Sequence, residues 1–298
     1  MPNAVDHEIF RPSHTLGVIL VAAGAVCWST AGLVVRGVEV GPWEIMFWRS
    51  IFLMVAMLPV LLVRMGSASL AGWWGGGWPV IASGFLLSGC FIFFILALSM
   101  TTVANALFVM ACGPLLAAVV GRVFFGERVS PRTWLAILAA GVGIALMVWN
   151  SLERGNLGGA VLAFLVAFCF SINANLVRHH REVSLLPGVF LAGLISALVA
   201  APFALPPTAT PTEFAMFAFL GFVQLGLGLV LFTIGARSVP AAQAVVIGLL
   251  EIVLGPLWVW FAFGESPELL ALVGGGIVLA AVAADALIGI VRHRDRTP

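Results

Sequence analysis

Long apolar runs, separated by short segments of Gly, Pro and polar residues, dominate the pattern of this chain. A helix needs ~20 residues to cross the hydrocarbon core of a bilayer. The apolar runs are continuous rather than alternating, which argues against membrane-spanning β-strands. They lie near residues 15–35, 43–63, 78–98, 103–124, 133–149, 157–177, 187–205, 213–235, 240–263 and 268–290. We therefore predict an all-α polytopic membrane protein of ten transmembrane helices, with nine as the main alternative because 187–205 is short.

The composition supports a membrane protein. Of the 298 residues, 62% are hydrophobic and only 9% are charged, whereas soluble domains carry about 25% charged residues. The net charge of +1 gives no basic surface of the kind that binds nucleic acid. The four cysteines lie inside apolar runs without a CxxC pair, so we expect buried thiols, no metal site and no cofactor.

The arginines indicate how the chain crosses the membrane. With the N-terminus in the cytoplasm, only Arg36 and Arg154 fall on the opposite side, and Arg49 falls within a span. The cytoplasmic segments hold Arg11, Arg64, Arg122, Arg128, Arg132, Arg178, Arg181, Arg237, Arg292, Arg294 and Arg296. Because short cytoplasmic loops are enriched in basic residues, we predict an inner-membrane protein with both termini in the cytoplasm.

Two segments of the chain recur in the same order. CWSTAGLVVR (27–36) resembles CFSINANLVR (169–178), and FFGE (124–127) resembles AFGE (262–265). The recurrence predicts two five-helix halves, residues 1–150 and 151–298. A repeat with an odd number of helices must insert its second copy upside down, and inverted repeats are typical of transporters with a midplane substrate site.

These residues resemble the drug/metabolite transporter superfamily in its ten-helix, EamA-type branch. The resemblance covers nearly the whole chain and rests on the duplicated aromatic–Ser segment, the position of Arg49 and the duplicated Gly-Glu pair. It implies a secondary transporter that exports small metabolites, often amino acids and in some members aromatic ones, by alternating access. The implied partners are a small-molecule substrate and membrane lipid, with the protein a monomer or weak homo-oligomer.

Polar residues within the spans are the first candidates for substrate binding, because such residues usually face the interior of the bundle. Glu251 lies halfway along its span, where it could bind an amine, carry a proton or tie helices together. Gln224 and Asn173 also lie mid-span, and the repeat aligns Asn105 with Gln243. We expect these five side chains to line the cavity, although polar ties between helices are the alternative.

Aromatic residues at equivalent places in the two halves are the second group of candidates. Trp28 and Phe170 each precede a serine, Ser29 and Ser171, and Phe94 has an aromatic equivalent in the second half. A flat apolar face beside hydroxyl groups suits an amino-acid side chain or another small amphiphile. We therefore expect the site to lie between Trp28–Ser29 and Phe170–Ser171.

Two prolines are candidate hinges for a transport cycle. Pro114 and Pro256 fall inside predicted spans, where proline removes a backbone hydrogen bond and can bend the helix. We expect the first, third, fourth, sixth, eighth and ninth spans to enclose the cavity, with the fifth and tenth at the periphery.

The remaining charged residues suggest structural roles. We expect Arg49 to pair with another group, with Glu44 a partner only if the helix end is irregular. Arg36 is expected to extend its side chain to the membrane surface. Glu127 and Glu265 each follow a glycine between two spans, and we interpret them as hairpin caps.

Three classes of function remain to be distinguished. The first is a transporter, exporting metabolites or, alternatively, drug-like amphiphiles. The second is a membrane-embedded enzyme acting on lipid-like substrates, which the absence of the HExxH, GxSxG and Walker motifs disfavours. The third is a scaffold whose polar midplane residues only hold helices together. The transporter is the best-supported hypothesis, and we predict no enzymatic activity.

Overall fold

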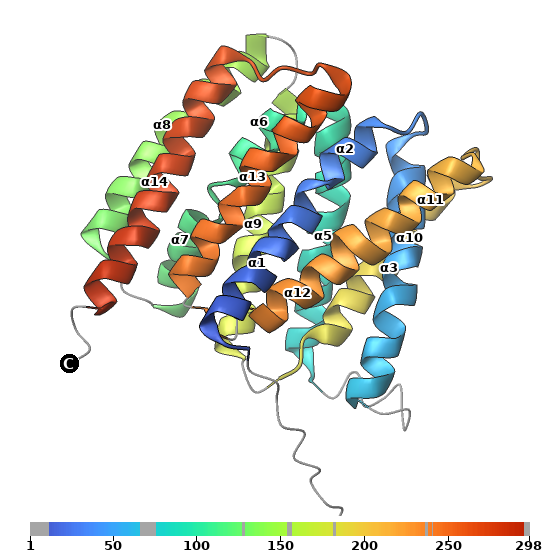
Figure 1. Cartoon of the computed structure of the whole chain (residues 1–298), viewed down its shortest axis with the longest axis horizontal. Helices are drawn as coiled ribbons and strands as arrows, with labels where there is room; N and C mark the ends of the chain where they lie inside the picture. Colours follow the sequence, from blue (N-terminus) through green and yellow to red (C-terminus); the bar gives the residue numbers. More distant parts are fainter. Residues whose placement is uncertain are drawn as a thin grey trace, which may run out of the picture.

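The computed structural model describes residues 12–65, 76–126, 129–153, 157–180, 183–235, 238–239 and 241–294. Every regular element within these ranges is a helix (Figure 1). In chain order they are α1 (His14–Ser29), α2 (Ala31–Arg36), α3 (Pro42–Met65), α5 (Trp78–Met100), α6 (Val103–Met110), α7 (Gly113–Phe125), α8 (Pro131–Glu153), α9 (Leu157–His179), α10 (Leu186–Ala204), α11 (Pro211–Phe219), the π-helix η1 (Leu220–Leu227), α12 (Gly228–Gly235), α13 (Ala241–Phe263) and α14 (Leu269–Arg294).

Within the described residues, seven helical stretches are long and apolar enough to cross a membrane, and three apolar helices are shorter. The shorter ones are Pro131–Leu146, Ile247–Phe263 and Leu269–Asp285. Large apolar side chains such as Val63, Leu135 and Phe261 are exposed on the outside of the bundle, as lipid-facing side chains are. The structure is that of a polytopic α-helical membrane protein.

Three predicted spans are interrupted. The first is divided at Thr30, whose hydroxyl donates a hydrogen bond to the Cys27 carbonyl (2.6 Å). The fourth is divided at Ala111–Cys112, and Pro114 lies in the first turn of α7, where its missing N–H costs little. The eighth changes from α-helix to π-helix over η1. The sequence predicted only the interruption beside Pro114.

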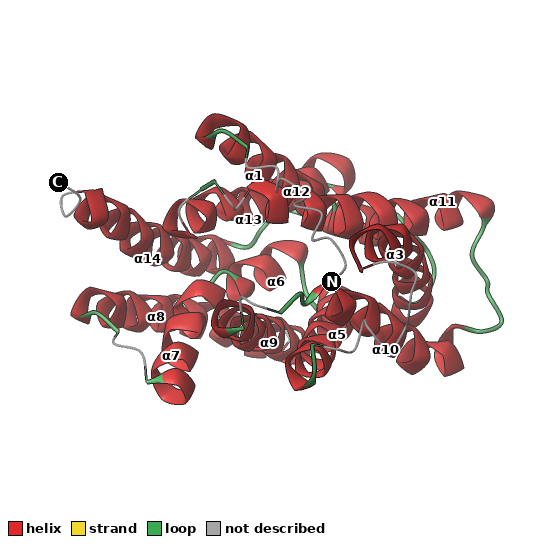
Figure 2. Cartoon of the chain, turned by 90° about the horizontal axis from the view of Figure 1, so that it is seen from below, coloured by secondary structure: helices red, strands yellow, loops and turns green. Residues whose placement is uncertain are grey.

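The helices close into a ring, which Figure 2 shows end-on. One row contains α14, α13, α1 and α12, and a second row contains α8, α7, α9, α5 and α10. At one end α8 packs on α14, and at the other α3 packs on both η1 and α10. The short α6 lies between the rows and contacts α9, α13 and α14.

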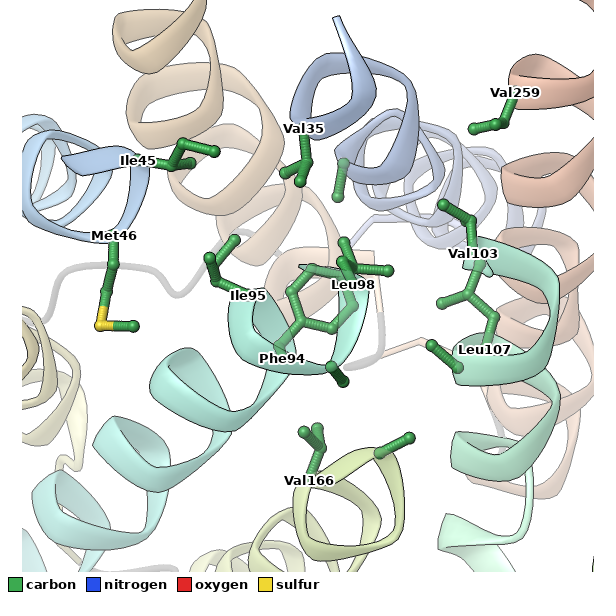
Figure 3. Packing of buried hydrophobic residues seen from close by; sticks show 14 of the residues in the cluster. Val35, Ile45, Met46, Phe94, Ile95, Leu98, Val103, Leu107, Val166 and Val259 are labelled. Atoms are coloured by element: carbon green, nitrogen blue, oxygen red, sulfur yellow. The ribbon is translucent and has the colours of Figure 1, made fainter. Parts of the chain in front are cut away.

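The largest group of buried apolar side chains lies where α5, α6 and α9 meet. Figure 3 shows Phe94 and Leu98 of α5 in one cluster with Leu107 of α6 and Val166 of α9. Phe94, Leu107 and Val166 also form part of a cavity wall, so the packed core and the candidate site share residues.

Candidate functional site

A cavity of about 270 Å³ lies inside the ring of helices. Its wall draws on α1, α3, α5, α6, α7, α9, α10, η1, α12 and α13. The lining residues are Trp28, Arg49, Leu53, Leu87, Cys90, Phe91, Phe94, Leu107, Met110, Gly113, Pro114, Val166, Ala167, Phe170, Val189, Gln224, Leu225, Leu229, Glu251 and Ile252. Neither α8 nor α14 contributes a described residue, as expected for the fifth and tenth spans. However, α3 and α10, the second and seventh spans, also line the cavity, which was not expected.

Aromatic rings form much of the wall. Trp28, Phe94 and Phe170, three of the sequence-predicted residues, line the cavity together with Phe91. The Trp28 ring packs at 5.0 Å (centroid to centroid) against Phe232 of α12. A Cβ atom on Gly228 would lie only 2.5 Å from the indole Nε1, so this position needs glycine for the Trp28 ring to fit.

Arg49 is the cation of the wall, whereas the sequence predicted a structural pair for it. Its side chain is 1% exposed, and its Nη2 donates a hydrogen bond to the Phe91 carbonyl (3.2 Å). The guanidinium carbon lies 5.5 Å from the centre of the Phe91 ring. Its Nε has no hydrogen-bond partner among the described residues.

No ion pair joins Arg49 to Glu44 among the described residues; the sequence allowed that partner only if the helix end were irregular. The Glu44 carboxylate accepts hydrogen bonds from the backbone N–H groups of Thr208 (2.8 Å) and Ala209 (2.9 Å), and from the Thr208 hydroxyl (2.6 Å). Glu44 therefore anchors the loop between α10 and α11 at the end of the bundle. Ionisable residues within a membrane are functional candidates by default. Arg49 has no acidic residue three or four positions away on its helix, and this feature of the sequence could have indicated a functional role.

Gln224 reaches the cavity from the π-helix η1. Close packing of η1 on α3 depends on Gly221, where an added Cβ would lie 2.4 Å from the Cβ of Phe52 and 2.9 Å from the Arg49 carbonyl oxygen. Gln224 is 3% exposed, and its Oε1 has no partner within the described part of the chain. A π-helix inside a longer helix is frequently found at a functional site.

Glu251 of α13 is the acidic residue of the wall. Its side chain is half-buried. No ion pair joins it to Arg49 or to any other described residue. The cavity thus contains one carboxyl group, one guanidinium and one primary amide in an otherwise apolar surface.

Four of the predicted polar residues lie in contacts between or within helices, outside the cavity wall. The Ser29 hydroxyl accepts a hydrogen bond from Trp258 Nε1 (3.0 Å), and the Ser171 hydroxyl lies 2.8 Å from the Gly113 carbonyl oxygen, to which it donates. Asn173 Oδ1 accepts from the Ser83 hydroxyl (2.7 Å), and Asn105 Nδ2 donates to the Thr101 hydroxyl (3.0 Å). Their role in substrate binding stays a prediction.

The remaining predicted residues, Pro114, Pro256 and Gln243, lie in different parts of the structure. Pro114 lies in the cavity wall, directly after the interruption between α6 and α7. Pro256 lies inside the uninterrupted helix α13 and borders a separate apolar pocket with Trp260 and Leu272. The Gln243 side chain is outside the described part of the structure.

An ion pair joins distant segments at one end of the bundle. Arg36 Nε lies 2.9 Å from Glu265 Oε2, and its Nη2 donates a hydrogen bond to the Thr101 carbonyl (2.7 Å). Glu265 Oε1 also accepts from the backbone N–H of Val103 (3.0 Å). Arg36 therefore does not simply extend toward the membrane surface, and Glu265 contacts α2 and α6 rather than capping its own hairpin. Glu127 lies outside the described residues.

Known proteins resemble this chain over most of its length. An uncharacterized transporter of Archaeoglobus fulgidus is 27% identical over 270 residues, which cover 89% of this chain and 94% of that protein. The pseudopaline exporter CntI of Pseudomonas aeruginosa is 25% identical over 286 residues, which cover 90% and 95%. A crystal structure with 19% identity aligns with a TM-score of 0.65 over 93% of this chain and 99% of that chain, which supports the fold.

A family model extends this likeness to both halves of the sequence. The model of the EamA-like transporter family matches residues 15–149 and, a second time, residues 157–284. The matched segments include the wall residues that carry charge, Arg49 and Glu251. The chain belongs to the EamA-like transporter family.

Proposed function

We propose that this chain exports small amphiphilic metabolites, namely amino acids or molecules like them, across the inner membrane by alternating access. The observation that carries the proposal is the cavity, in which Arg49, Gln224 and Glu251 are set in an apolar and aromatic wall. Pockets of this kind bind small molecules, because the apolar surface supplies affinity and a few polar groups fix the orientation.

The charges of the wall favour a zwitterionic substrate. A charged side chain at the centre of a membrane helix costs about 2.5–3.5 kcal/mol, and Arg49 and Glu251 do not offset this cost by pairing with each other. A molecule with one carboxylate and one ammonium group would neutralise both. The volume of about 270 Å³ is near the lower limit of ligand pockets and favours a small metabolite over a large drug.

The relatives support export of a small organic molecule. The name of the Pseudomonas aeruginosa relative describes an exporter, and the likeness covers 95% of that protein. We extend to this chain only the direction of transport.

We also propose that ten spans form two inverted halves, residues 1–150 and 151–298, with both termini in the cytoplasm. The repeated family match supports two halves. The packing supports a pseudo-two-fold arrangement, because α5 packs on α9 as α12 packs on α1, and α7 packs on α9 as α13 packs on α1. In this topology the Arg36–Glu265 pair joins the two halves at the non-cytoplasmic end, where it must separate for release to that side.

Counterflow into proteoliposomes tests the proposal. Vesicles containing the purified chain and loaded with an unlabelled amino acid should accumulate labelled L-leucine, L-phenylalanine or L-tryptophan faster than protein-free vesicles. Ethidium, a cationic aromatic dye, tests drug efflux as the alternative. Accumulation of ethidium without any amino acid would favour that alternative, and accumulation of none of these compounds would contradict the proposal.

A matched pair of glycine variants links transport to the cavity. Gly113 lines the cavity, and Gly141 lies exposed on the peripheral α8; an added Cβ at either position meets no atom within 4 Å. Gly113→Leu should therefore fill the cavity and abolish counterflow, whereas Gly141→Leu should retain it. Equal transport by the two variants would place the substrate elsewhere.

A further inference from the structure

We infer that Arg49, assisted by Gln224, binds the carboxylate of the transported molecule and so determines which substrates are accepted. This inference rests on the proposed function and deepens it by assigning a chemical group of the substrate to a particular side chain. It concerns a residue that sequence reasoning had placed in a structural pair, and the geometry of the cavity assigns it a different role.

First, most N–H donors of the Arg49 guanidinium have no hydrogen-bond acceptor among the described residues. A guanidinium has five N–H donors, and the described residues supply one acceptor, the neutral Phe91 carbonyl. The Phe91 ring adds a cation–π contact at 5.5 Å, which provides no counter-charge. A buried cation normally has an anionic partner, and the missing partner at Arg49 can be supplied by a ligand in the cavity.

The second step is that nearby acidic residues are otherwise engaged. The carboxylate of Glu44, on the same helix, accepts three hydrogen bonds from Thr208 and Ala209. Glu265 is paired with Arg36. Glu251 shares the cavity with Arg49 but forms no ion pair with it. No carboxylate among the described residues therefore neutralises Arg49, although Arg–carboxylate pairing is the strong and directional interaction that guanidinium groups make in proteins.

The third step is the position of Gln224. Because Gly221 lets the backbone of η1 approach the α3 backbone at Arg49, the first turn of η1 is fixed beside that residue. Gln224, three residues later, enters the same cavity and has a buried amide oxygen without a partner. Since amide O and N are assigned rather than observed, the amide group can present either a donor to a carboxylate or an acceptor to an ammonium group.

Together these groups predict how a substrate is oriented. The carboxylate lies at Arg49, an ammonium group is attracted by Glu251, and an apolar side chain contacts the aromatic surface of Trp28 and Phe170. A cationic amphiphile without a carboxylate would instead add a second positive charge to a cavity that already holds Arg49. Such like-charge contact is the means by which a site excludes the wrong ligand.

The inference is tested with matched compounds that differ only in the carboxylate. Unlabelled L-leucine, L-phenylalanine and L-tryptophan compete for counterflow with their amides and with the corresponding decarboxylated amines. For the wild-type protein we expect each acid to compete at least about tenfold better than its amide or amine, the loss typical of a hydrogen bond to a charged group. Equal competition by acid and amide, with transport intact, would overturn the role of Arg49 while leaving the proposed function standing.

Variants assign the effect to Arg49. Arg49→Gln should reduce the preference for acid over amide to about onefold, and Arg49→Lys should restore part of it, because lysine keeps the charge but loses the planar fork. Arg132→Gln is the matched control, since Arg132 pairs with Asp285 on the peripheral helices (3.4 Å). A preference that survives in Arg49→Gln would refute the inference. The competition assay with the wild-type protein tests the role of Arg49 without any variant. That test can still be made if Arg49→Gln misfolds.

Discussion

Arg36 and Arg49 lie on helices that follow one another in the chain, α2 and α3, but they are in opposite electrostatic situations. Arg36 lies 2.9 Å from Glu265 and 2.7 Å from the Thr101 carbonyl, whereas Arg49, among the described residues, contacts the Phe91 carbonyl at 3.2 Å and the Phe91 ring at 5.5 Å. The paired arginine joins three segments at one end of the bundle. The unpaired one lies in the wall of a cavity. From this difference we expect the paired arginine to hold helices together and the arginine without a counter-ion to bind a ligand.

The largest expected effect comes from removing the unpaired cation. Arg49→Met should reduce counterflow of L-phenylalanine at least ~100-fold, because the substrate loses a charge-assisted pair in a desolvated cavity. The thermal stability of the empty protein should stay the same or rise, since an unpaired buried charge is costly. Tryptophan fluorescence during heating in detergent measures stability. A large loss of stability would mean that Arg49 supports the fold rather than the substrate.

The second effect concerns the acidic residue of the same cavity. Glu251→Gln preserves the size of the side chain and removes its charge, so counterflow of L-phenylalanine should fall about tenfold. Inhibition by 3-phenylpropanoate, which keeps the carboxylate and lacks the amine, should be unchanged or stronger than in the wild type. Loss of inhibition by that compound would show that Glu251 does not contact the amine.

The paired arginine should behave differently. Glu265→Gln removes the counter-ion of Arg36 but keeps hydrogen-bonding groups, and the two charged side chains are 29% and 24% exposed. Solvent weakens such a pair, so we expect a loss of about 1 kcal/mol in stability and a change in transport of only a few-fold. The acid-to-amide preference should be unchanged. A double-mutant cycle with Arg36→Gln measures the coupling free energy between the two side chains. A value near zero would contradict the proposal that the pair joins the two halves at the non-cytoplasmic end.

Much of the fold could be predicted from the sequence because hydropathy and helix length are set by the bilayer. The ten predicted spans correspond to helical stretches of the structure with ends shifted by a few residues, for example 78–98 against Trp78–Met100. The interruption at Thr30 and the π-helix η1 were not predicted. The π-helix packs on α3 through Gly221, and no local sequence pattern encodes such a contact between helices.

Site residues could be predicted where a polar residue is rare in an apolar span. They could not be predicted where the rotation of a helix about its axis determines which side chain faces the cavity. Glu251 and Gln224 are rare polar groups in apolar spans, and both line the cavity. Adjacent residues of a helix point about 100° apart at 3.6 residues per turn, and here Trp28 lines the cavity whereas the Ser29 hydroxyl contacts Trp258. In helices that are apolar all round, no polar stripe reveals which of the two faces inward. The same ambiguity separates Phe170 from Ser171.

The smallest expected effect tests that rotation. Ser29→Ala and Ser171→Ala remove hydrogen bonds to Trp258 and to the Gly113 carbonyl, respectively. Hydrogen bonds between membrane helices contribute about 0.6 kcal/mol on average, so each variant should lose roughly that much stability. The KM for L-phenylalanine should not change, because neither hydroxyl lies in the cavity wall. A raised KM at unchanged stability would indicate that the two serines contact the substrate. It would also imply that α1 and α9 rotate during transport and exchange the faces that Trp28 and Ser29 now present.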